Sequence, residues 1–191
     1  GRNPHIAVNP WGVIFVSFYS VTDSAVCFAA YYEGVWDTYI IDSTGNPGRH
    51  NDISFSPPTG MPCVVYADFN TGAFYFAEFV NDAWQISLID GSGRQGLYPS
   101  LFVMPDGKPY VSYQDATDTN NFHLRYATRI DGAWYTSVVD STPGCGYNTS
   151  ITVNGDGHVH IAHNNGSTAL YSRYDGSSWA NAVLGGSNVF G

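Results

Sequence analysis

The fold is decided by residues 96–140, which read GLYPSLFVMPDGKPYVSYQDATDTNNFHLRYATRIDGAWYTSVVD. This stretch holds short segments rich in aromatic and β-branched residues, each bounded by turn residues, at 101–103, 109–114, 122–129 and 134–139. The steps Asp106-Gly107 and Asp131-Gly132 are hairpin signals, because Asp-Gly tolerates the positive φ angles of a tight turn. The stretch therefore predicts an antiparallel meander of four strands.

The same unit recurs along the whole chain. A Trp opens the last predicted strand of each unit, at Trp36, Trp84, Trp134 and Trp179. Their spacings of 48, 50 and 45 residues are typical of propeller blades, since a four-stranded unit of this size cannot bury both faces alone. We therefore predict an all-β fold, a β-propeller of four four-stranded antiparallel blades in a single domain, with blades at about residues 1–42, 43–90, 91–140 and 141–191.

The glycines before the innermost strands predict that the ring of blades closes. Steps of 47, 48, 50 and 45 residues separate Gly1, Gly48, Gly96, Gly146 and Gly191, so the last glycine occupies the same repeat position as the first. We expect the last blade to dock on the first and complete one cycle. The alternative is a larger ring of blades drawn from two chains.

Charge and composition exclude some functions. The 16 acidic and 7 basic residues give a formal charge of −9, whereas a nucleic-acid binder needs a basic face. No apolar run is long enough for a membrane span. Only 12% of residues are charged, and Asn, Ser, Thr and Gly are abundant, which is typical of extracellular β-proteins. We expect a secreted or cell-surface protein without nucleic-acid partners.

The cysteines are odd in number and form no CxxC pair, so their spacing excludes a zinc ribbon. Cys27 and Cys63 stand where other blades place Phe and Tyr, which favours packed thiols, with a disulfide as the alternative. Cys145 lies in the Gly-rich linker TPGCG. We expect Cys145 to be an exposed thiol that pairs between chains or remains reactive.

Four motifs carry a resemblance to a known family: YPSL, DGKPYVSYQDA, LRYATR and DGAW, at 98–101, 106–116, 124–129 and 131–134. The chain resembles the sialidase-like and lectin-like propeller repeats of secreted microbial proteins, most strongly in the third unit. Similarity to sialidases would imply an arginine triad that grips a carboxylate. Arg2 and Arg49 occupy matching blade positions, but Leu97 and Tyr147 stand at the other two. We therefore expect no enzymatic activity.

The end of the second strand of each blade offers candidate binding residues. An aromatic residue there precedes a polar residue by two positions, so both side chains share one strand face. Saccharides are held by such pairs, with the C–H face on a ring and the hydroxyls on a carboxylate or amide. The alternative is that the rings pack between blades and the polar residues close turns. The candidate ligand-binding residues are Tyr66, Asp68, Tyr113, Asp115, His163 and Asn165.

Two further patterns concern metals and glycans. His158 and His160 share a strand face as a possible metal pair, but no third ligand is evident and His160 aligns with core positions, so we expect no metal or other cofactor. Asn148 and Asn165 head N-glycosylation sequons. If Asn165 carries a glycan, it cannot also bind one.

These observations favour a non-catalytic extracellular module for carbohydrate binding or adhesion, whose partners are glycans. A structural and glycosylated subunit of an extracellular filament or surface array, with self-association, is the alternative. A sialidase-like glycosidase is the third reading and has the least support among the residues.

Overall fold

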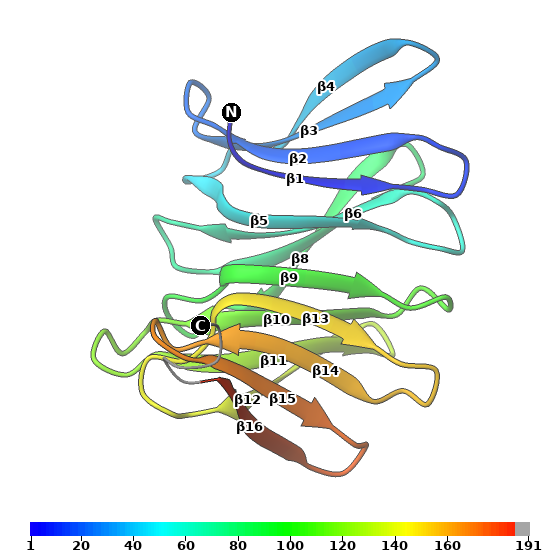
Figure 1. The fold of residues 1–191 in the computed structure, drawn as a ribbon. Helices are drawn as coiled ribbons and strands as arrows, with labels where there is room; N and C mark the ends of the chain where they lie inside the picture. The colour runs from blue at the N-terminus through cyan, green and yellow to red at the C-terminus, as the bar shows by residue number, and fades with distance from the viewer. Residues whose placement is uncertain (186–191) are drawn as a thin grey trace.

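The computed structural model describes residues 1–185, all of whose regular structure is β-strand (Figure 1). Blade 1 consists of β1 (Arg2–Val8), β2 (Ile14–Ser20), β3 (Ala25–Tyr32) and β4 (Val35–Asp42). Blade 2 consists of β5 (Pro47–Phe55), β6 (Pro62–Asp68), β7 (Phe74–Val80) and β8 (Ala83–Asp90). Blade 3 consists of β9 (Leu97–Val103), β10 (Pro109–Asp115), β11 (His123–Ile130) and β12 (Ala133–Asp140). Blade 4 consists of β13 (Tyr147–Val153), β14 (Val159–Asn164), β15 (Ala169–Tyr174) and β16 (Trp179–Gly185).

Each blade is a four-stranded sheet whose strands pair antiparallel in chain order. This arrangement confirms the predicted all-β fold of four propeller blades. The described residues include no helix of the length and apolar character that crossing a bilayer requires.

The innermost strands begin earlier than the sequence suggests. β9 starts at Leu97 rather than at residue 101, because a β-bulge lets its first residues pair again with β10 at Gln114. Tyr98 has a φ of 49° in this bulge. Gly96 precedes it with a φ of 76°, and a Cβ at that position would lie 2.1 Å from the ring of Phe74. The repeated glycine is therefore required by both the backbone and the neighbouring blade.

The hydrophobic cores lie between the blades. In the core shared by blades 2 and 3, Leu101 and Val103 of β9 pack with Val65 and Phe76 of blade 2. Equivalent cores join blade 1 to blade 2 and blade 3 to blade 4. Each blade is therefore stable only through its neighbours, as expected for a repeat array.

The blades form an open arc. β1 packs on β5, β5 on β9 and β9 on β13, and Figure 1 shows blades 1 and 4 at opposite ends of this series. Within residues 1–185, no comparable contact joins β13 to β1. The expected docking of the last blade on the first is therefore absent from this conformation, because three repeats of the same inter-blade step do not bring the ends together. Gly191, on which that expectation also rested, lies outside the described residues.

All three cysteines are free and buried, which makes the prediction for Cys145 wrong. Cys145 is 0% exposed, and its sulfur lies 3.1 Å from the amide nitrogen of Leu124 in the preceding sheet. Burial raises the pKa of the Cys145 thiol to about 12, so it is not a reactive thiolate. The linker folds back into the core between blades 3 and 4. Cys27 and Cys63 are packed thiols, as the sequence favoured.

Candidate functional site

The structure buries the two tyrosines of the predicted aromatic pairs. Tyr66 and Tyr113 are both 0% exposed. Each donates its hydroxyl hydrogen to an aspartate at the end of the preceding blade, Tyr66 to Asp42 and Tyr113 to Asp90, at 2.9 Å in both cases. Burial raises the pKa of both phenols, which keeps them protonated as donors. Their rings present no free face, in line with the packing alternative, and a binding role for them stays a prediction.

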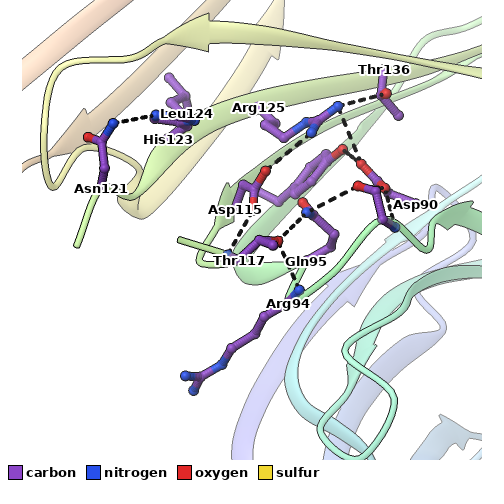
Figure 2. A network of polar contacts seen from close by, with 12 residues as sticks. Asp90, Arg94, Gln95, Asp115, Thr117, Asn121, His123, Leu124, Arg125 and Thr136 are labelled. Carbon is purple, nitrogen blue, oxygen red and sulfur yellow. Dashed lines mark hydrogen bonds and ion pairs between the residues drawn. The ribbon is translucent and has the colours of Figure 1, made fainter. Parts of the chain in front are cut away.

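Asp115 belongs to a half-buried ion-pair network rather than to an open surface (Figure 2). Arg125 lies between Asp115 at 3.2 Å and Asp90 at 3.5 Å, and it donates to the Thr136 hydroxyl at 3.1 Å. Burial alone would raise the pKa of Asp115, but hydrogen bonds from Thr117 and from Arg125 outweigh it and lower the pKa. The network fixes blade 3 against the end of blade 2.

Asp68 and Asn165 close turns. Asp68 is 4% exposed, and its carboxylate accepts hydrogen bonds from the amides of Asn46 and Asn70 and from the Thr71 hydroxyl, at 2.8 to 3.0 Å. The side-chain oxygen Oδ1 of Asn165 accepts a hydrogen bond from the backbone amide of Thr168 at 2.9 Å. Both side chains do what the turn-closing alternative describes. Asn165 remains partly exposed and Asn148 is exposed.

The predicted histidines lie apart from any metal-like cluster. His163 is 4% exposed and lies 3.1 Å from the Ser172 hydroxyl. His160 bonds the Tyr171 hydroxyl at 2.7 Å, and His158 lies 3.1 Å from the guanidinium of Arg173. Among the residues that the structure describes, no three His, Cys, Asp or Glu side chains are grouped to hold a metal ion.

An open groove lies between blades 3 and 4, with a volume of about 440 Å³. Its floor is aromatic: Trp179 packs edge-on against Tyr126 of the preceding blade, with ring centroids 5.4 Å apart, and in a tilted arrangement against Tyr174 of its own blade, at 5.3 Å. These three rings are only half-buried. They therefore present apolar ring surface to whatever enters the groove, the surface that a sugar's C–H face packs on.

Polar groups line the same groove beside the rings. Lys108 is the chain's single lysine, and its ammonium lies 5.2 Å from the centre of the Tyr110 ring. Thr128 donates its hydroxyl hydrogen to the carbonyl of Pro109, which leaves its oxygen able to accept. Within residues 1–185, the Ser137 hydroxyl makes no hydrogen bond to protein. The groove thus combines ring faces with free donors and acceptors, as small-ligand sites do.

The other two blade boundaries differ at this position. The groove between blades 1 and 2 has about 470 Å³ but is lined mostly by apolar side chains, with Trp84 on Phe28 and with Asp82 at its edge. Between blades 2 and 3, the Arg129 guanidinium lies over the Phe76 ring at 5.2 Å and pairs with both carboxylate oxygens of Glu78. Of the boundaries described, the one between blades 3 and 4 is therefore the polar aromatic groove.

Sequence reasoning missed this groove because it assigned every blade Trp to packing. Trp179 does pack on Tyr126, yet it is half-buried and also lines the groove. The available signal was Lys108, a lone lysine directly after the hairpin glycine, where the other blades have Val13, Met61 and His158. Alignment of the four repeats therefore distinguishes blade 3 from the others at this position.

A second cleft, of about 420 Å³, lies along the innermost strands. Its lining includes Arg49, His50, Tyr98 and Asn148. Arg49 is held over the Phe69 ring at 4.5 Å, and His50 Nδ1 lies 3.3 Å from the amide nitrogen of Tyr98. Burial lowers the pKa of His50, which matches its role as an acceptor. No carboxylate is among the described residues that line this cleft.

No family model and no curated protein matches this sequence. Solved structures do match its fold. The SapL1 lectin in complex with α-methyl fucoside has a TM-score of 0.67 and 18% identity, over 94% of this chain and 61% of that one. The Aleuria aurantia lectin AAL in complex with Fucα1-6GlcNAc has a TM-score of 0.65 and 12% identity, over 94% and 62%. A GH43_12 protein retrieved from a capybara gut metagenome has a TM-score of 0.56 and 12% identity, over 94% and 41%.

These similarities show the fold, a propeller-type array of four-stranded blades. The chain spans about 60% of the length of these two lectins. The resemblance to lectin-like propellers is therefore supported at the level of fold, and the sialidase-like part of the resemblance stays a prediction.

Proposed function

We propose that this chain is a carbohydrate-binding β-propeller module that takes a neutral or weakly charged saccharide into the groove between blades 3 and 4. The observation that carries the proposal is the presence of half-buried Tyr126, Tyr174 and Trp179 rings beside the free polar groups of Lys108 and Ser137. Two of the lectins that share the fold were solved with fucosides bound, which makes an α-fucoside the first ligand to test.

The chemistry of the groove suits a saccharide. An aromatic face gains from contact with the C–H groups of a pyranose, while the hydroxyls of the sugar need donors and acceptors around its rim. The Lys108 ammonium supplies up to three donors, and the Ser137 and Thr128 oxygens supply acceptors. A single groove of this kind gives weak binding, which becomes useful when many copies face a glycan-coated surface.

A glycan array on the wild-type chain tests the proposal. Lys108→Ala and Trp179→Phe should lower binding of the retained glycans several-fold, because one removes a donor and the other shrinks the ring surface. The matched control is Tyr135→Ala, an exposed ring of β12 outside the groove. Asp68→Ala and Asp115→Ala test the sequence-predicted pairs in the same assay. Loss of binding in these two variants alone, with each still folded, would move the site away from the groove.

A glycosidase is the second candidate, because a GH43 protein shares the fold. Glycoside hydrolysis needs two carboxyl groups on either side of the bond that breaks. A panel of chromogenic aryl glycosides, including α-L-arabinofuranosides and β-xylosides, decides between the two functions. Binding without turnover favours the module, and turnover that is lost on replacing one carboxylate favours the enzyme.

We also propose that the module is extracellular. The low charge content, the sequons at Asn148 and Asn165 and the abundance of small polar residues support an extracellular location. Mass analysis of the chain isolated from its source would test whether Asn148 or Asn165 carries a glycan.

A further inference from the structure

Every blade boundary in the structure repeats one aromatic contact. The Trp of each later blade packs edge-on against a ring on the third strand of the blade before it, at 5.2 to 5.4 Å, in the pairs Phe28–Trp84, Phe76–Trp134 and Tyr126–Trp179. Two members of the pattern have no such partner within residues 1–185. They are Trp36 of blade 1, which is 51% exposed, and Tyr171, which holds the ring position in blade 4.

The innermost strand of blade 1 also lacks the contact that the other innermost strands make with a preceding blade. Ile53, Leu101 and Ile151 occupy one repeat position, pack against the preceding blade and are 5 to 7% exposed. Ile6 holds this position in blade 1 and is 67% exposed. Val8, two residues further, is 51% exposed. Blade 1 therefore presents a face that every other blade buries against a blade of its own kind.

The polar contacts across the boundaries identify which blade fits that face. The Asp that ends a blade meets a polar ring of the next blade in every described boundary: Asp42 with Tyr66, Asp90 with Tyr113, and Asp140 with His163. At the two ends of the chain both partners change together. Blade 1 has Phe18 at the ring position, and blade 4 has Gly185 at the Asp position. A buried hydroxyl or carboxylate facing either residue would lose its partner, so Phe18 and Gly185 suit each other.

A second set of positions behaves in the same way. Ser17 donates to Asn51 at 2.6 Å, and Ser112 donates to Thr149 at 2.8 Å, each across a boundary. Between blades 2 and 3 both positions are apolar, as Val65 and Pro99. The corresponding residues at the chain ends are Ala162 of blade 4 and Pro4 of blade 1, again an apolar pair, and both are exposed. The two end faces match at the polar and at the apolar positions.

We propose that the blade 4 face of one molecule docks on the blade 1 face of a second copy, so that the chain assembles head to tail. The new boundary places Trp36 on Tyr171 and sets the Ile6 amide beside the Ser150 hydroxyl. The same bond joins the Ile151 amide to the Ser100 hydroxyl inside the chain, at 3.3 Å. A second copy supplies the blade because the two faces of one molecule lie at opposite ends of the arc (Figure 1). The contact uses different surfaces on the two partners, so it builds either a closed ring of two or more copies or an open filament.

Cysteine cross-linking tests the proposed boundary directly. Pro4→Cys and Ala162→Cys are made as separate variants and mixed under a mild oxidant, with the native thiols kept out of reaction by their burial. A disulfide-linked two-chain product should form in the mixture and in neither variant alone. Ser112→Cys with Thr149→Cys in one chain is the positive control, since these hydroxyl oxygens lie 2.8 Å apart. A Pro4→Cys, Ala162→Cys double variant that yields only an internally bridged monomer would instead show ring closure within one chain and overturn the proposal.

Mass measurement over a concentration series provides the second test. The wild-type 191-residue chain should give species of two or more copies. Trp36→Glu should raise the concentration at which half of the chains are associated by at least ten-fold. Tyr135→Glu changes a similarly exposed aromatic residue away from both end faces, and it should leave that concentration unchanged. Thermal unfolding checks that both variants fold. A wild-type chain that remains monomeric at all concentrations contradicts the proposal, and equal effects of the two variants contradict the proposed interface.

Discussion

The Tyr113 hydroxyl lies 2.9 Å from a carboxylate oxygen of Asp90, and this hydrogen bond joins blade 3 to the end of blade 2. Tyr66 makes the same bond to Asp42 one boundary earlier. The apolar contacts between blades are non-directional, whereas a buried hydrogen bond requires a defined distance and angle. These bonds therefore help to set how each blade is placed on the one before it.

Removing that hydroxyl should destabilise the array. Tyr113→Phe leaves the Oδ2 atom of the buried Asp90 carboxylate with Arg125 as its remaining partner, while Oδ1 keeps its bonds to Ser92, and we expect the free energy of unfolding to fall by about 1–2 kcal/mol. Urea denaturation measures the change. Tyr135→Phe, which removes a hydroxyl from an exposed ring, should stay within about 0.5 kcal/mol of wild type. Equal losses in the two variants would mean that the Tyr113 bond contributes nothing specific.

The blade tryptophans should differ in their contribution to stability. Trp134 packs on Phe76 and donates its indole N–H to the Ser87 hydroxyl at 3.0 Å, so Trp134→Ala should cost about 3 kcal/mol or more. Trp36 is 51% exposed, and Trp36→Ala should cost about 1 kcal/mol or less in the monomer. Unfolding at a concentration where the chain is monomeric checks both values. A similar loss for the two would contradict the open arc.

The ion pair between Arg129 and Glu78 should couple blades 2 and 3. Each side chain is 24% exposed, so solvent weakens the attraction and we expect a coupling energy of about 1 kcal/mol. A double-mutant cycle with Arg129→Met and Glu78→Gln gives this energy. Each single change leaves one charge without its partner, whereas the double change removes both. A coupling energy near zero would show that the bidentate contact is not maintained in solution.

His163 should make the stability fall in mild acid. Burial lowers the pKa of His163, against the opposing effect of nearby Asp140. As the pH falls, His163 therefore takes up a proton in the unfolded chain before it does so in the folded chain. The contribution of neutral His163 to stability is complete above the ordinary His pKa of about 6.5, and it is lost as the pH falls from that value towards the folded pKa. His163→Gln should flatten the decline in unfolding free energy between about pH 7.5 and 5. The same slope in wild type and His163→Gln would assign the acid sensitivity to other groups.

The sequence predicted the blades because the repeat is local. Each strand is a short segment rich in apolar residues, the first hairpin of each blade has a glycine, and each blade Trp lies 12 residues before the next repeated glycine, as Trp36 does before Gly48. The starts of the inner strands were missed, because the Gly-Leu-Tyr-Pro segment at 96–99 suggests a linker, and only the bulge at Tyr98 lets it pair with β10. The sequence analysis expected a closed ring and missed the open arc, because the repeat period does not encode the angle between blades.

The site residues were harder to predict for a physical reason. A ring and a polar group on one strand face are compatible with binding and with packing, and contacts with the preceding blade decide which occurs. Tyr66 and Tyr113 are covered by that blade, while Trp179 is half-buried and lines the groove between blades 3 and 4. Cys145 was placed wrongly because its Gly-rich linker allows the chain to turn inward.

The central claim is that the groove between blades 3 and 4 binds saccharide, and indole NMR tests it most directly. The chain has five tryptophans, so a ¹⁵N-labelled sample gives five indole signals that single Trp→Phe variants assign. Titration with α-methyl fucoside, or with a glycan retained on the array, should move the Trp179 signal progressively and leave Trp11 and Trp134 in place. A saturable shift of another indole with Trp179 unmoved, or no shift at any indole while the glycan binds, would contradict the assignment of the site.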